Sequence, residues 1–312
     1  MRRVLVTGGA GFIGSQIVRT LLEDGLEVSV LDKLTYAGRR EHLAGLPVRL
    51  RVGDVTDPAA VAEAVEGMDA VVHAAAESHV ARSLERPEVF VVNNVEGARV
   101  MLDLANRAGV RRFLYLSTDE VFGSAPPGVR FGPHDVHRPG NAYAASKSGA
   151  EAFVHAWRHT WRYPAMIVRC TNNYGPRQHP EKAVPWWILA GLGGGPIPVQ
   201  GEGRAVRDWL HVRDLAEGIR LALRRWSPGA TWHFSGASPL SAREMASRVS
   251  ALSGGAPLSR LPERQGQDAC YALDDAETRV ALGWAPRIPL EDGLVETVSW
   301  YREHGGLWGS RA

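Results

Sequence analysis

The sequence predicts an α/β protein: a Rossmann-type, doubly wound parallel sheet with a smaller C-terminal α/β substrate domain. Short apolar runs alternate with longer helical patterns over residues 1–172, which is typical of a parallel sheet covered by helices on both faces. A glycine-rich turn follows the first run. The alternation weakens later, and glycine and proline cluster at 191–203. We therefore expect a nucleotide-binding domain at 1–172, to which 205–228 returns, and a substrate domain at 173–312.

The first turn has the pattern of a dinucleotide-binding loop. Residues 3–7 form a short apolar strand, glycine follows at Gly8, Gly11 and Gly14, and a helical pattern begins at once. Glycines at this spacing permit a tight turn and a close approach of the backbone to phosphate. The helix N-terminus then presents free N–H groups to a pyrophosphate.

An acidic residue ends the second apolar run. Residues 26–31 alternate into a strand that ends at Asp32, where a carboxylate can accept hydrogen bonds from ribose hydroxyls. Because a carboxylate repels a 2′-phosphate, Asp32 favours NAD over NADP, and the nearby Lys33 and Arg39 weaken that preference. The alternative interpretation of Asp32 is a solvated loop acid.

The third and fourth strands add contacts for the same ligand. They are predicted at residues 48–52 and 70–72. After the third, Asp54 is placed to hold an adenine amino group and Val55 to pack on the ring. After the fourth, the small residues at 74–76 let the backbone approach a cofactor closely.

The fifth strand, at residues 112–116, delivers polar groups to the predicted site. Thr118, Asp119 and Glu120 stand where it ends, and ligands of parallel sheets bind beyond the carboxyl ends of the strands. Side chains of adjacent residues diverge there, so the two carboxylates can reach different atoms. Without this context, Asp119 and Glu120 would be read as a solvated turn.

Tyr143 and Lys147 are four residues apart, so they share one face of the helix predicted at 143–161. A lysine beside a phenol favours the phenolate and lowers a pKa that is ordinarily about 10. The pair therefore predicts a catalytic base. A Tyr-x-x-x-Lys pattern alone also occurs on exposed helices, and its position after a dinucleotide-binding loop favours the catalytic interpretation.

The remaining elements are predicted from periodicity alone. Residues 89–108 are long and amphipathic, and they read as one helix. Residues 206–212 and a helix at 212–225 are expected to return to the main sheet. The other predictions are strands at 166–170 and 232–235 and helices at 241–253 and 290–301.

Composition excludes several classes of protein. The 36 basic and 34 acidic residues give a net charge of +2, which is too balanced for a nucleic-acid-binding protein. No apolar run approaches the roughly 18 residues of a membrane helix, and the N-terminus lacks the pattern of a signal peptide. Cys170 and Cys270 are far apart and show no metal-binding spacing. We expect a cytoplasmic protein with reduced cysteines, no metal and no membrane partner.

These motifs resemble the extended short-chain dehydrogenase/reductases and, within them, the dTDP-glucose 4,6-dehydratase family. The Asp119-Glu120 pair is the specific part of the resemblance, because related epimerases and decarboxylases lack it at that position. The resemblance extends to about Asp214. The matching segments are residues 32–38, 75–80, 117–123, 143–147, 169–176 and 207–212.

The resemblance implies a reaction on a nucleotide sugar with tightly held NAD. Tyr143 would take the proton of the 4-hydroxyl during C4 oxidation, Lys147 would hold the nicotinamide ribose, and Thr118 would orient the 4-oxygen. Glu120 would then remove the C5 proton while Asp119 protonates the departing 6-hydroxyl. Neighbouring carboxylates suit these roles because their repulsion favours one acid and one base. The product would be a 4-keto-6-deoxy sugar.

The resemblance also implies the binding residues and a homodimer formed through helices 89–108 and 143–161. Arg207 would hold the diphosphate by its bidentate fork, and the alternative is a salt bridge to Asp208 or Asp214. The cofactor would be held by Gly8, Gly11, Phe12, Ile13, Gly14, Asp32, Lys33, Thr35, Asp54, Val55, Ala74, Ala75, Ala76, Asn94, Tyr143 and Lys147. The substrate would be held by Ser78, His79, Arg82, Asn172, Glu181, Lys182, Arg207 and Arg264.

Other functions remain open from the sequence. An NAD-dependent nucleotide-sugar 4-epimerase or a uronic acid decarboxylase would use the same loop and Tyr–Lys pair. A dehydratase acting on a UDP-sugar would use the carboxylates as well. A non-catalytic NAD-binding regulator would be expected to have lost Tyr143, Lys147 or the carboxylates, and the sequence retains all of them.

Overall fold

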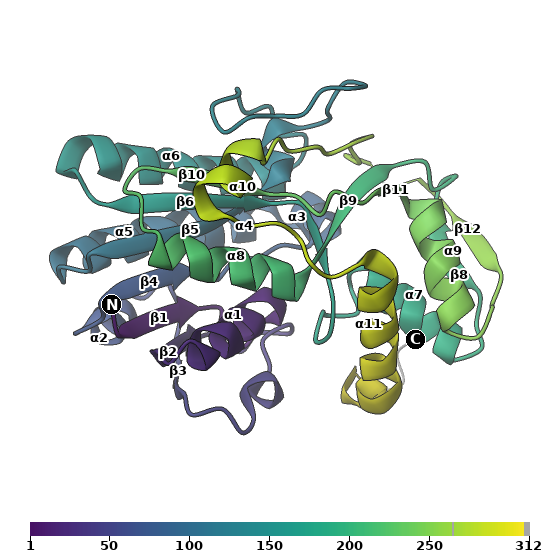
Figure 1. The fold of residues 1–312 in the computed structure, drawn as a ribbon, viewed down its shortest axis with the longest axis horizontal. Helices are drawn as coiled ribbons and strands as arrows, with labels where there is room; N and C mark the ends of the chain where they lie inside the picture. Colours follow the sequence, from purple (N-terminus) through teal and green to yellow (C-terminus); the bar gives the residue numbers. More distant parts are fainter. Residues whose placement is uncertain (264, 309–312) are drawn as a thin grey trace.

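The computed structural model describes residues 1–263 and 265–308. Its centre is a seven-stranded sheet with the order β10-β6-β5-β4-β1-β2-β3, in which every neighbouring pair is parallel (Figure 1). The predicted Rossmann-type parallel sheet is confirmed. The strands are β1 (Arg3–Thr7), β2 (Glu27–Asp32), β3 (Arg49–Val52), β4 (Ala70–His73), β5 (Arg112–Thr118), β6 (Ala165–Cys170) and β10 (Thr231–Phe234).

Helices cover both faces of this sheet because alternate strand residues point to opposite sides. Val4 and Val6 pack with α1 (Phe12–Glu23) and α8 (Val212–Arg224). Leu5, between them, packs with the helices of the other face (Figure 1), which are α2 (Pro58–Val65), α5 (Gly97–Arg107) and α6 (Ala142–Trp161). The strand order reverses beside β1, and ligands of such sheets bind at that point, outside the carboxyl ends of the strands.

The segment predicted as one helix at 89–108 is interrupted. It consists of α4 (Pro87–Phe90), a π-helical stretch η2 (Val91–Glu96) and α5, preceded by the short α3 (Val80–Glu85). A π turn holds one residue more than an α turn and is frequent at functional sites. It therefore shifts which side chains face the sheet.

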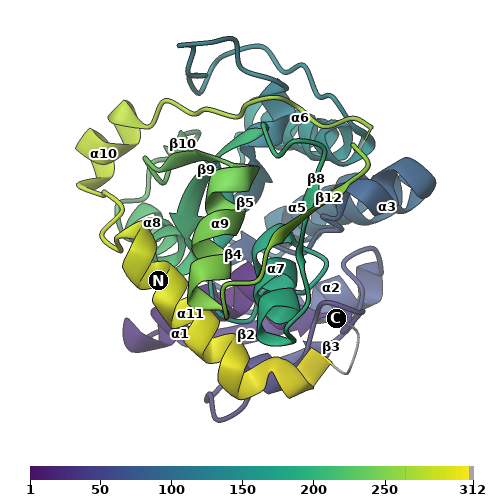
Figure 2. The ribbon, with the colours of Figure 1, turned by 90° about the vertical axis from the view of Figure 1, so that its right-hand side faces the viewer.

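A second, smaller lobe stands at the carboxyl edge of the main sheet and faces the viewer in Figure 2. Trp187, Met245 and Tyr301 belong to its own apolar core. Its strands form a three-stranded sheet, β11-β9-β7, and a two-stranded sheet, β12-β8. Its main elements are β7 (Asn172–Tyr174), α7 (Ala183–Leu192), β8 (Ile197–Gln200), β9 (Val206–His211), β11 (Pro239–Ser241), α9 (Ala242–Leu252), β12 (Leu258–Leu261) and α11 (Leu290–His304).

The expectation that residues 206–212 return to the main sheet is wrong. The chain leaves β6 directly into β7, which pairs with β9 in the smaller lobe instead. The return begins one element later, because α8 packs against α1 and β10 extends the main sheet beyond β6. The short remaining elements are η1 (Arg40–Leu43), η3 (Asp119–Phe122), α10 (Ala276–Leu282) and η4 (Gly305–Trp308).

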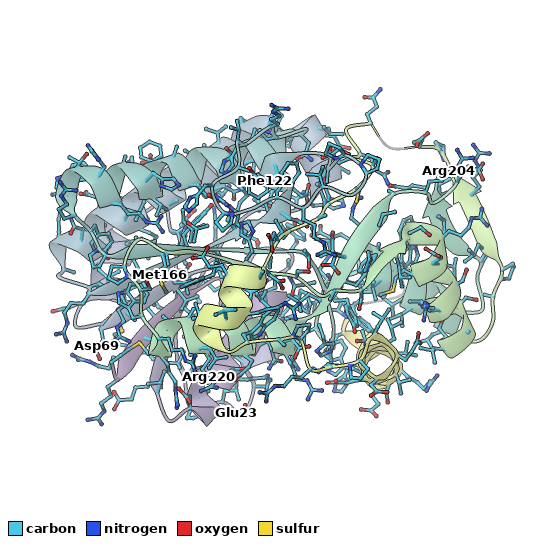
Figure 3. All side chains as sticks on the ribbon, turned by 45° about the horizontal axis from the view of Figure 1, so that its top comes forward. Glu23, Asp69, Phe122, Met166, Arg204 and Arg220 are labelled. Atoms are coloured by element: carbon cyan, nitrogen blue, oxygen red, sulfur yellow. The ribbon has the colours of Figure 1, made fainter. Side chains whose placement is uncertain are left out.

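The side chains fill the interior of both lobes (Figure 3). Met166 lies within the main sheet, while Asp69 and Arg204 mark opposite ends of the molecule. In the described part of the chain, no helix combines the length and apolar character needed to cross a membrane. Cys170 and Cys270 are both free thiols.

Candidate active site

One cavity opens at the carboxyl edge of the main sheet, and its first wall is the turn after β1. Gly8 has a φ of +69°, and a Cβ there would lie 2.8 Å from the Cα of Ala75. The turn therefore needs glycine both for its backbone conformation and for close packing against the strand-end loop of β4. Helix α1 has no side-chain cap and no acidic residue in its first turn, so its N-terminal N–H groups are available to a phosphate.

Asp32 anchors the far end of this cradle. Its Oδ2 accepts the Ala10 N–H at 2.9 Å, and its Oδ1 accepts the Leu34 N–H at 2.8 Å. Burial raises the pKa of Asp32, and these two hydrogen bonds oppose that shift. Lys33 pairs with Asp54 at 2.5 Å, and both side chains line the cavity.

The residues predicted to hold a cofactor line this one cavity, apart from Asn94. They are Gly8, Gly11, Phe12, Ile13, Gly14, Asp32, Lys33, Thr35, Asp54, Val55, Ala74, Ala75, Ala76, Tyr143 and Lys147. A close-packed glycine turn, an uncapped helix N-terminus and a buried acid at the end of β2 together fit a dinucleotide.

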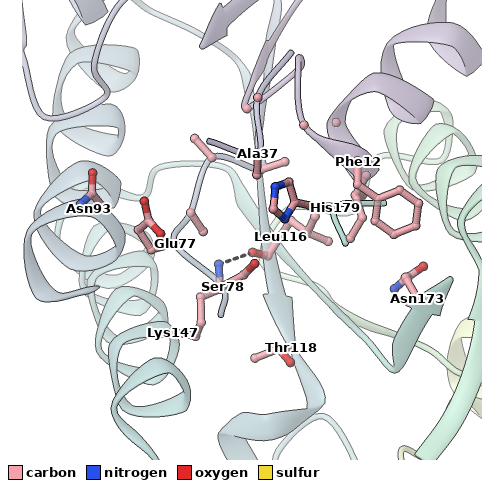
Figure 4. Close-up of a pocket in the computed structure, with 18 of the residues that line it drawn as sticks. Phe12, Ala37, Glu77, Ser78, Asn93, Leu116, Thr118, Lys147, Asn173 and His179 are labelled. Carbon is pink, nitrogen blue, oxygen red and sulfur yellow. Dashed lines mark hydrogen bonds between the residues drawn. The ribbon is translucent and has the colours of Figure 1, made fainter. Parts of the chain in front are cut away.

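Asn94 corrects the sequence prediction. It is buried and does not line the cavity. Its amide donates to the Glu77 carbonyl at 2.9 Å and to the Ser146 hydroxyl at 2.8 Å, and its Oδ1 accepts the Glu77 N–H. Asn94 therefore ties the loop after β4 to α6, and its neighbour Asn93 reaches the cavity (Figure 4).

The predicted catalytic residues meet at the other end of the cavity. Thr118 is the last residue of β5, and Asp119 and Glu120 begin η3. Tyr143 and Lys147 come from the first turns of α6, whose start is fixed by Asn141, because its Oδ1 accepts the Ala144 N–H at 2.8 Å. All five predicted catalytic side chains line the cavity.

A buried ion pair holds α6 on the sheet behind these residues. Arg169 of β6 donates to Glu151 of α6 at 2.6 and 2.9 Å, and both side chains are almost completely buried. Glu151 lies one turn beyond Lys147, and its charge opposes the loss of the lysine proton. The ion pair therefore fixes the position of the helix that carries Tyr143 and Lys147.

Asp119 is set up as an acid. Burial first, and the neighbouring charge of Glu120 second, hold its pKa well above the ordinary value for a carboxyl. Its Oδ1 accepts the Thr118 hydroxyl at 3.1 Å, whereas its Oδ2 has no hydrogen-bond partner among the described residues. A carboxyl with a raised pKa beside a second carboxyl that lines the cavity is the arrangement that paired acid–base chemistry requires.

The prediction that Lys147 lowers the pKa of Tyr143 is not met. Burial and the charge of Glu120 raise the pKa of Tyr143 well above its ordinary value, and a hydrogen bond with Thr118 opposes the shift. The Lys147 ammonium instead donates to the Leu116 carbonyl at 2.7 Å (dashed in Figure 4) and lies over the Tyr115 ring. Burial lowers the pKa of Lys147 to about 8.

We expect Lys147→Met to raise the free energy of unfolding by about 1–3 kcal/mol near neutral pH while turnover falls, because a buried cation is removed. The folded-state pKa lies below the unfolded value of 10.5. The unfolded state therefore binds more protons between these two pKa values, and wild-type stability rises with pH there. Urea unfolding should show that the stability gain of Lys147→Met over the wild type is smaller at about pH 10 than at about pH 7. A Lys147→Met variant that is less stable at both pH values would contradict the assignment.

The predicted substrate residues divide into two groups. Ser78, Asn172, Glu181 and Lys182 line the cavity, and the Lys182 ammonium donates to the Ser78 carbonyl at 2.6 Å. Glu181 accepts the Tyr36 hydroxyl at 3.1 Å.

Three other predicted substrate residues, His79, Arg82 and Arg207, do not line the cavity. Arg82 lies over the Tyr36 ring, 4.0 Å from its centroid, and His79 lies 3.7 Å from Glu181. Arg207 donates to the carbonyls of Val206 and Asp268. Asp208 instead accepts hydrogen bonds from Ser235 and Ser238, and Asp214 accepts the Ile288 N–H, so the alternative salt bridge does not form among the described residues. The eighth predicted residue, Arg264, lies outside the described residues.

The sequence analysis did not predict two residues that donate hydrogen bonds to Glu120. The Asn141 amide and the Tyr271 hydroxyl each donate to Glu120 Oε2 at 3.2 Å. Asn141 could have been found as the N-cap before a predicted helix. Tyr271 had no such signal, because it comes from a loop 151 residues further along the chain. Within 1–263 and 265–308, no group of His, Cys, Asp and Glu side chains is arranged to hold a metal ion.

Comparison with known proteins agrees with this geometry. Residues 4–233 match the family described as the NAD dependent epimerase/dehydratase family. The chain is 41% identical to a dTDP-glucose 4,6-dehydratase from Streptomyces niveus, over 98% of this chain and 94% of the relative.

Solved structures give the same result. DesIV, a dTDP-glucose 4,6-dehydratase from Streptomyces venezuelae crystallised with NAD, has a TM-score of 0.95 and 41% identity, covering 98% of this chain and 99% of that one. The UDP-glucose 4-epimerase of Thermus thermophilus in complex with NAD has a TM-score of 0.90 and 32% identity, covering 96% of this chain and 99% of that one. In each case the similarity extends over nearly the whole chain.

Proposed function

The chain belongs to the NAD dependent epimerase/dehydratase family, and we propose that it converts dTDP-glucose to dTDP-4-keto-6-deoxyglucose. The reaction is an oxidation at C4, an elimination of water across C5 and C6, and a reduction at C6. The product is a deoxysugar precursor, so a role in deoxysugar biosynthesis follows. The two free cysteines agree with a cytoplasmic location.

NAD is the cofactor, and the glycine turn, the N-terminus of α1 and Asp32 are the parts of this chain that would hold it. When bound, it supplies the acceptor for C4 oxidation, the donor for C6 reduction and, when oxidised, a positive charge that favours the Tyr143 phenolate. Tyr143 Oη takes the proton of the 4-hydroxyl. Thr118, whose hydroxyl lies beside both Tyr143 and Asp119, orients the 4-oxygen.

The observation that carries the proposal is the pair of unlike carboxyls in the cavity of Tyr143. A ketone at C4 acidifies the C5 proton, and Glu120, fixed by Asn141 and Tyr271, is placed to remove it. Asp119, which burial keeps protonated, gives its proton to the departing 6-hydroxyl. The base and the acid come from adjacent residues of η3, so they reach adjacent carbons of one sugar.

A 4-epimerase is the second candidate, because the chain also resembles an enzyme of that activity. Epimerisation needs the oxidation and reduction at C4 but no acid and base at C5 and C6. A buried, protonated Asp119 would have no role in it, and decarboxylation of a uronic acid would not use it either. We further propose that Ser78, Asn172, Glu181 and Lys182 contact the nucleotide sugar, since they line the same cavity.

Product analysis tests this function. The protein would be incubated separately with dTDP-glucose and UDP-glucose, and the products would be examined by mass spectrometry. We expect loss of one water and faster conversion of dTDP-glucose. A product that is an isomer of the substrate, with unchanged mass, would favour the epimerase. Faster loss of water from UDP-glucose would show that the preferred substrate carries UDP and not dTDP.

We also propose a homodimer built on the helices at 87–107 and 142–161. The stretch before α5 exposes Val91 and Val92 by 56% and 50%, and α6 exposes Trp161 by 53%, so apolar side chains face outward on both segments. We expect light scattering to give the mass of a dimer and Val92→Glu to shift the population toward monomer. A wild-type protein that is monomeric at micromolar concentration would contradict the proposal.

A further inference from the structure

Glu120 is held between the start of α6 and the loop that carries Tyr271. Its Oε2 accepts two hydrogen bonds, one from the Asn141 amide and one from the Tyr271 hydroxyl, both at 3.2 Å. Glu120 itself lines the cavity, whereas Tyr271 is 5% exposed and does not. The two donors therefore fix Oε2 of a side chain that lines the cavity, and Oε1 is left as the oxygen that can take a proton.

The Tyr271 hydroxyl stands between two carboxylates. Its oxygen lies 3.2 Å from Glu120 Oε2 and 2.8 Å from Asp268 Oδ2. A phenol has one proton, so it can donate to only one of them at a time. Burial and the two carboxylates raise the pKa of Tyr271 far above its ordinary value, so the group remains a phenol throughout.

The loop that carries Tyr271 is fixed in place. The Arg207 guanidinium lies 4.3 Å from the centroid of the Tyr271 ring and donates to the Asp268 carbonyl at 2.9 Å. A Cβ on Gly140 would lie 3.0 Å from Asp268 Oδ1, so the carboxylate packs tightly against the start of α6. The position of Tyr271 relative to Glu120 is therefore set by both lobes.

We infer that Tyr271 is a positioning residue for the C5 base: its hydroxyl donates to ionised Glu120 and turns to Asp268 once Glu120 is protonated. This inference rests on the proposed dehydratase function. In the step itself, the C5–H bond breaks, the proton goes to Glu120 Oε1, and the electron pair stays on the sugar as the enolate of the C4 ketone. Tyr271 keeps its own proton and changes only the acceptor.

Such a hydroxyl serves both states of the base. When Glu120 is charged, a hydrogen bond to it orients the free oxygen and stabilises the charge. When Glu120 is neutral, the same hydrogen finds an acceptor in Asp268 Oδ2, so the buried hydroxyl is never left unpaired. Phenylalanine would keep the ring beneath Arg207 and remove only this function.

The test is Tyr271→Phe in the full-length protein, assayed with dTDP-glucose carrying hydrogen or deuterium at C5. We expect kcat to fall about 10- to 100-fold with KM unchanged, since a hydrogen bond to a charged group is lost. The deuterium isotope effect from C5 should rise, because proton removal becomes slower than the other steps. Oxidation at C4, followed by the absorbance of reduced nicotinamide in a single turnover, should keep its rate.

Two further variants separate positioning from folding. Tyr163→Phe alters another buried tyrosine, remote from Glu120, and should leave all rates unchanged. Asp268→Asn removes the carboxylate to which the Tyr271 hydroxyl turns, so the C5 step should slow and its isotope effect should rise while C4 oxidation keeps its rate. Equal loss of the C4 and C5 steps in Tyr271→Phe, or an unchanged C5 isotope effect, would overturn the inference. If the wild-type protein releases no water from the sugar, the proposed function falls, and this inference falls with it.

Discussion

Tyr143→Phe is expected to lower turnover by about 10²- to 10⁴-fold, because the group that takes the 4-hydroxyl proton is lost. Tyr143 enters the cavity from the first turn of α6, and its neighbours there are Thr118 and Glu120. Removal of one oxygen leaves the ring and its edge-to-face contact with Phe90, 6.4 Å between centroids. The fold should therefore persist while C4 oxidation stops.

The measurement is a single turnover with excess protein, in which the absorbance of reduced nicotinamide reports C4 oxidation. The variant should show no fast phase and should keep the melting temperature and NAD binding of the wild type. Tyr163→Phe is the matched control, since it removes a buried hydroxyl outside the cavity. Turnover near the wild-type rate in Tyr143→Phe would require another base.

Asp119→Asn is expected to separate oxidation from elimination. The amide has nearly the same shape but cannot give a proton to the departing 6-hydroxyl, so water loss should fall by about 10²- to 10⁴-fold. Oxidation at C4 depends on Tyr143 and should continue. The protonated acid is already neutral, so its replacement by a neutral amide of the same shape should leave the stability close to that of the wild type.

The sign of the pH effect follows from the raised pKa of Asp119. The acid is active only when protonated, so water elimination should decline as pH rises through that pKa. In the Asp119→Asn variant, the residual rate of water elimination should no longer decline as the pH rises. Rapid quenching and mass spectrometry would separate the 4-ketosugar that retains its 6-hydroxyl from the dehydrated product. If Asp119→Asn slowed C4 oxidation and water elimination to the same degree, it would contradict the assignment of Asp119 to the elimination step alone.

The parts of the site that the sequence could predict are local. Gly8, Gly11 and Gly14 act within one turn, and Asp32 ends the next strand, so both follow from spacing along the chain. Tyr143 and Lys147 share a helix face for the same reason, and all of these residues line the cavity. The parallel sheet could also be predicted from the sequence, because each strand is a short apolar run between helical patterns.

The remaining features depend on contacts between distant segments. Asn93 takes the place expected for Asn94 because a π-helical stretch changes the face presented to the cavity, and the amphipathic pattern does not reveal such a turn. Residues 206–211 do not join the main sheet, because they form β9, which pairs with β7 in the smaller lobe. The contact of Tyr271 with Glu120 depends on the packing of the second lobe and has no local signature.

The raised pKa of Tyr143 is a further example. The four-residue spacing to Lys147 is local, but the Lys147 ammonium finds the carbonyl of Leu116 on the neighbouring strand β5. Which partner a buried lysine chooses depends on the sheet beneath it, and helix spacing alone does not decide this. The same holds for Asp119, whose elevated pKa is caused mainly by burial.

The most direct test of the central claim uses dTDP-glucose with deuterium at C4, incubated with the wild-type protein and examined by NMR and mass spectrometry. We expect the product to have lost one water, the label to have moved from C4 to C6, and a run in deuterated water to place one solvent deuteron at C5. A product of unchanged composition with the label still at C4 would contradict elimination by Asp119 and Glu120. It would identify the protein as an epimerase.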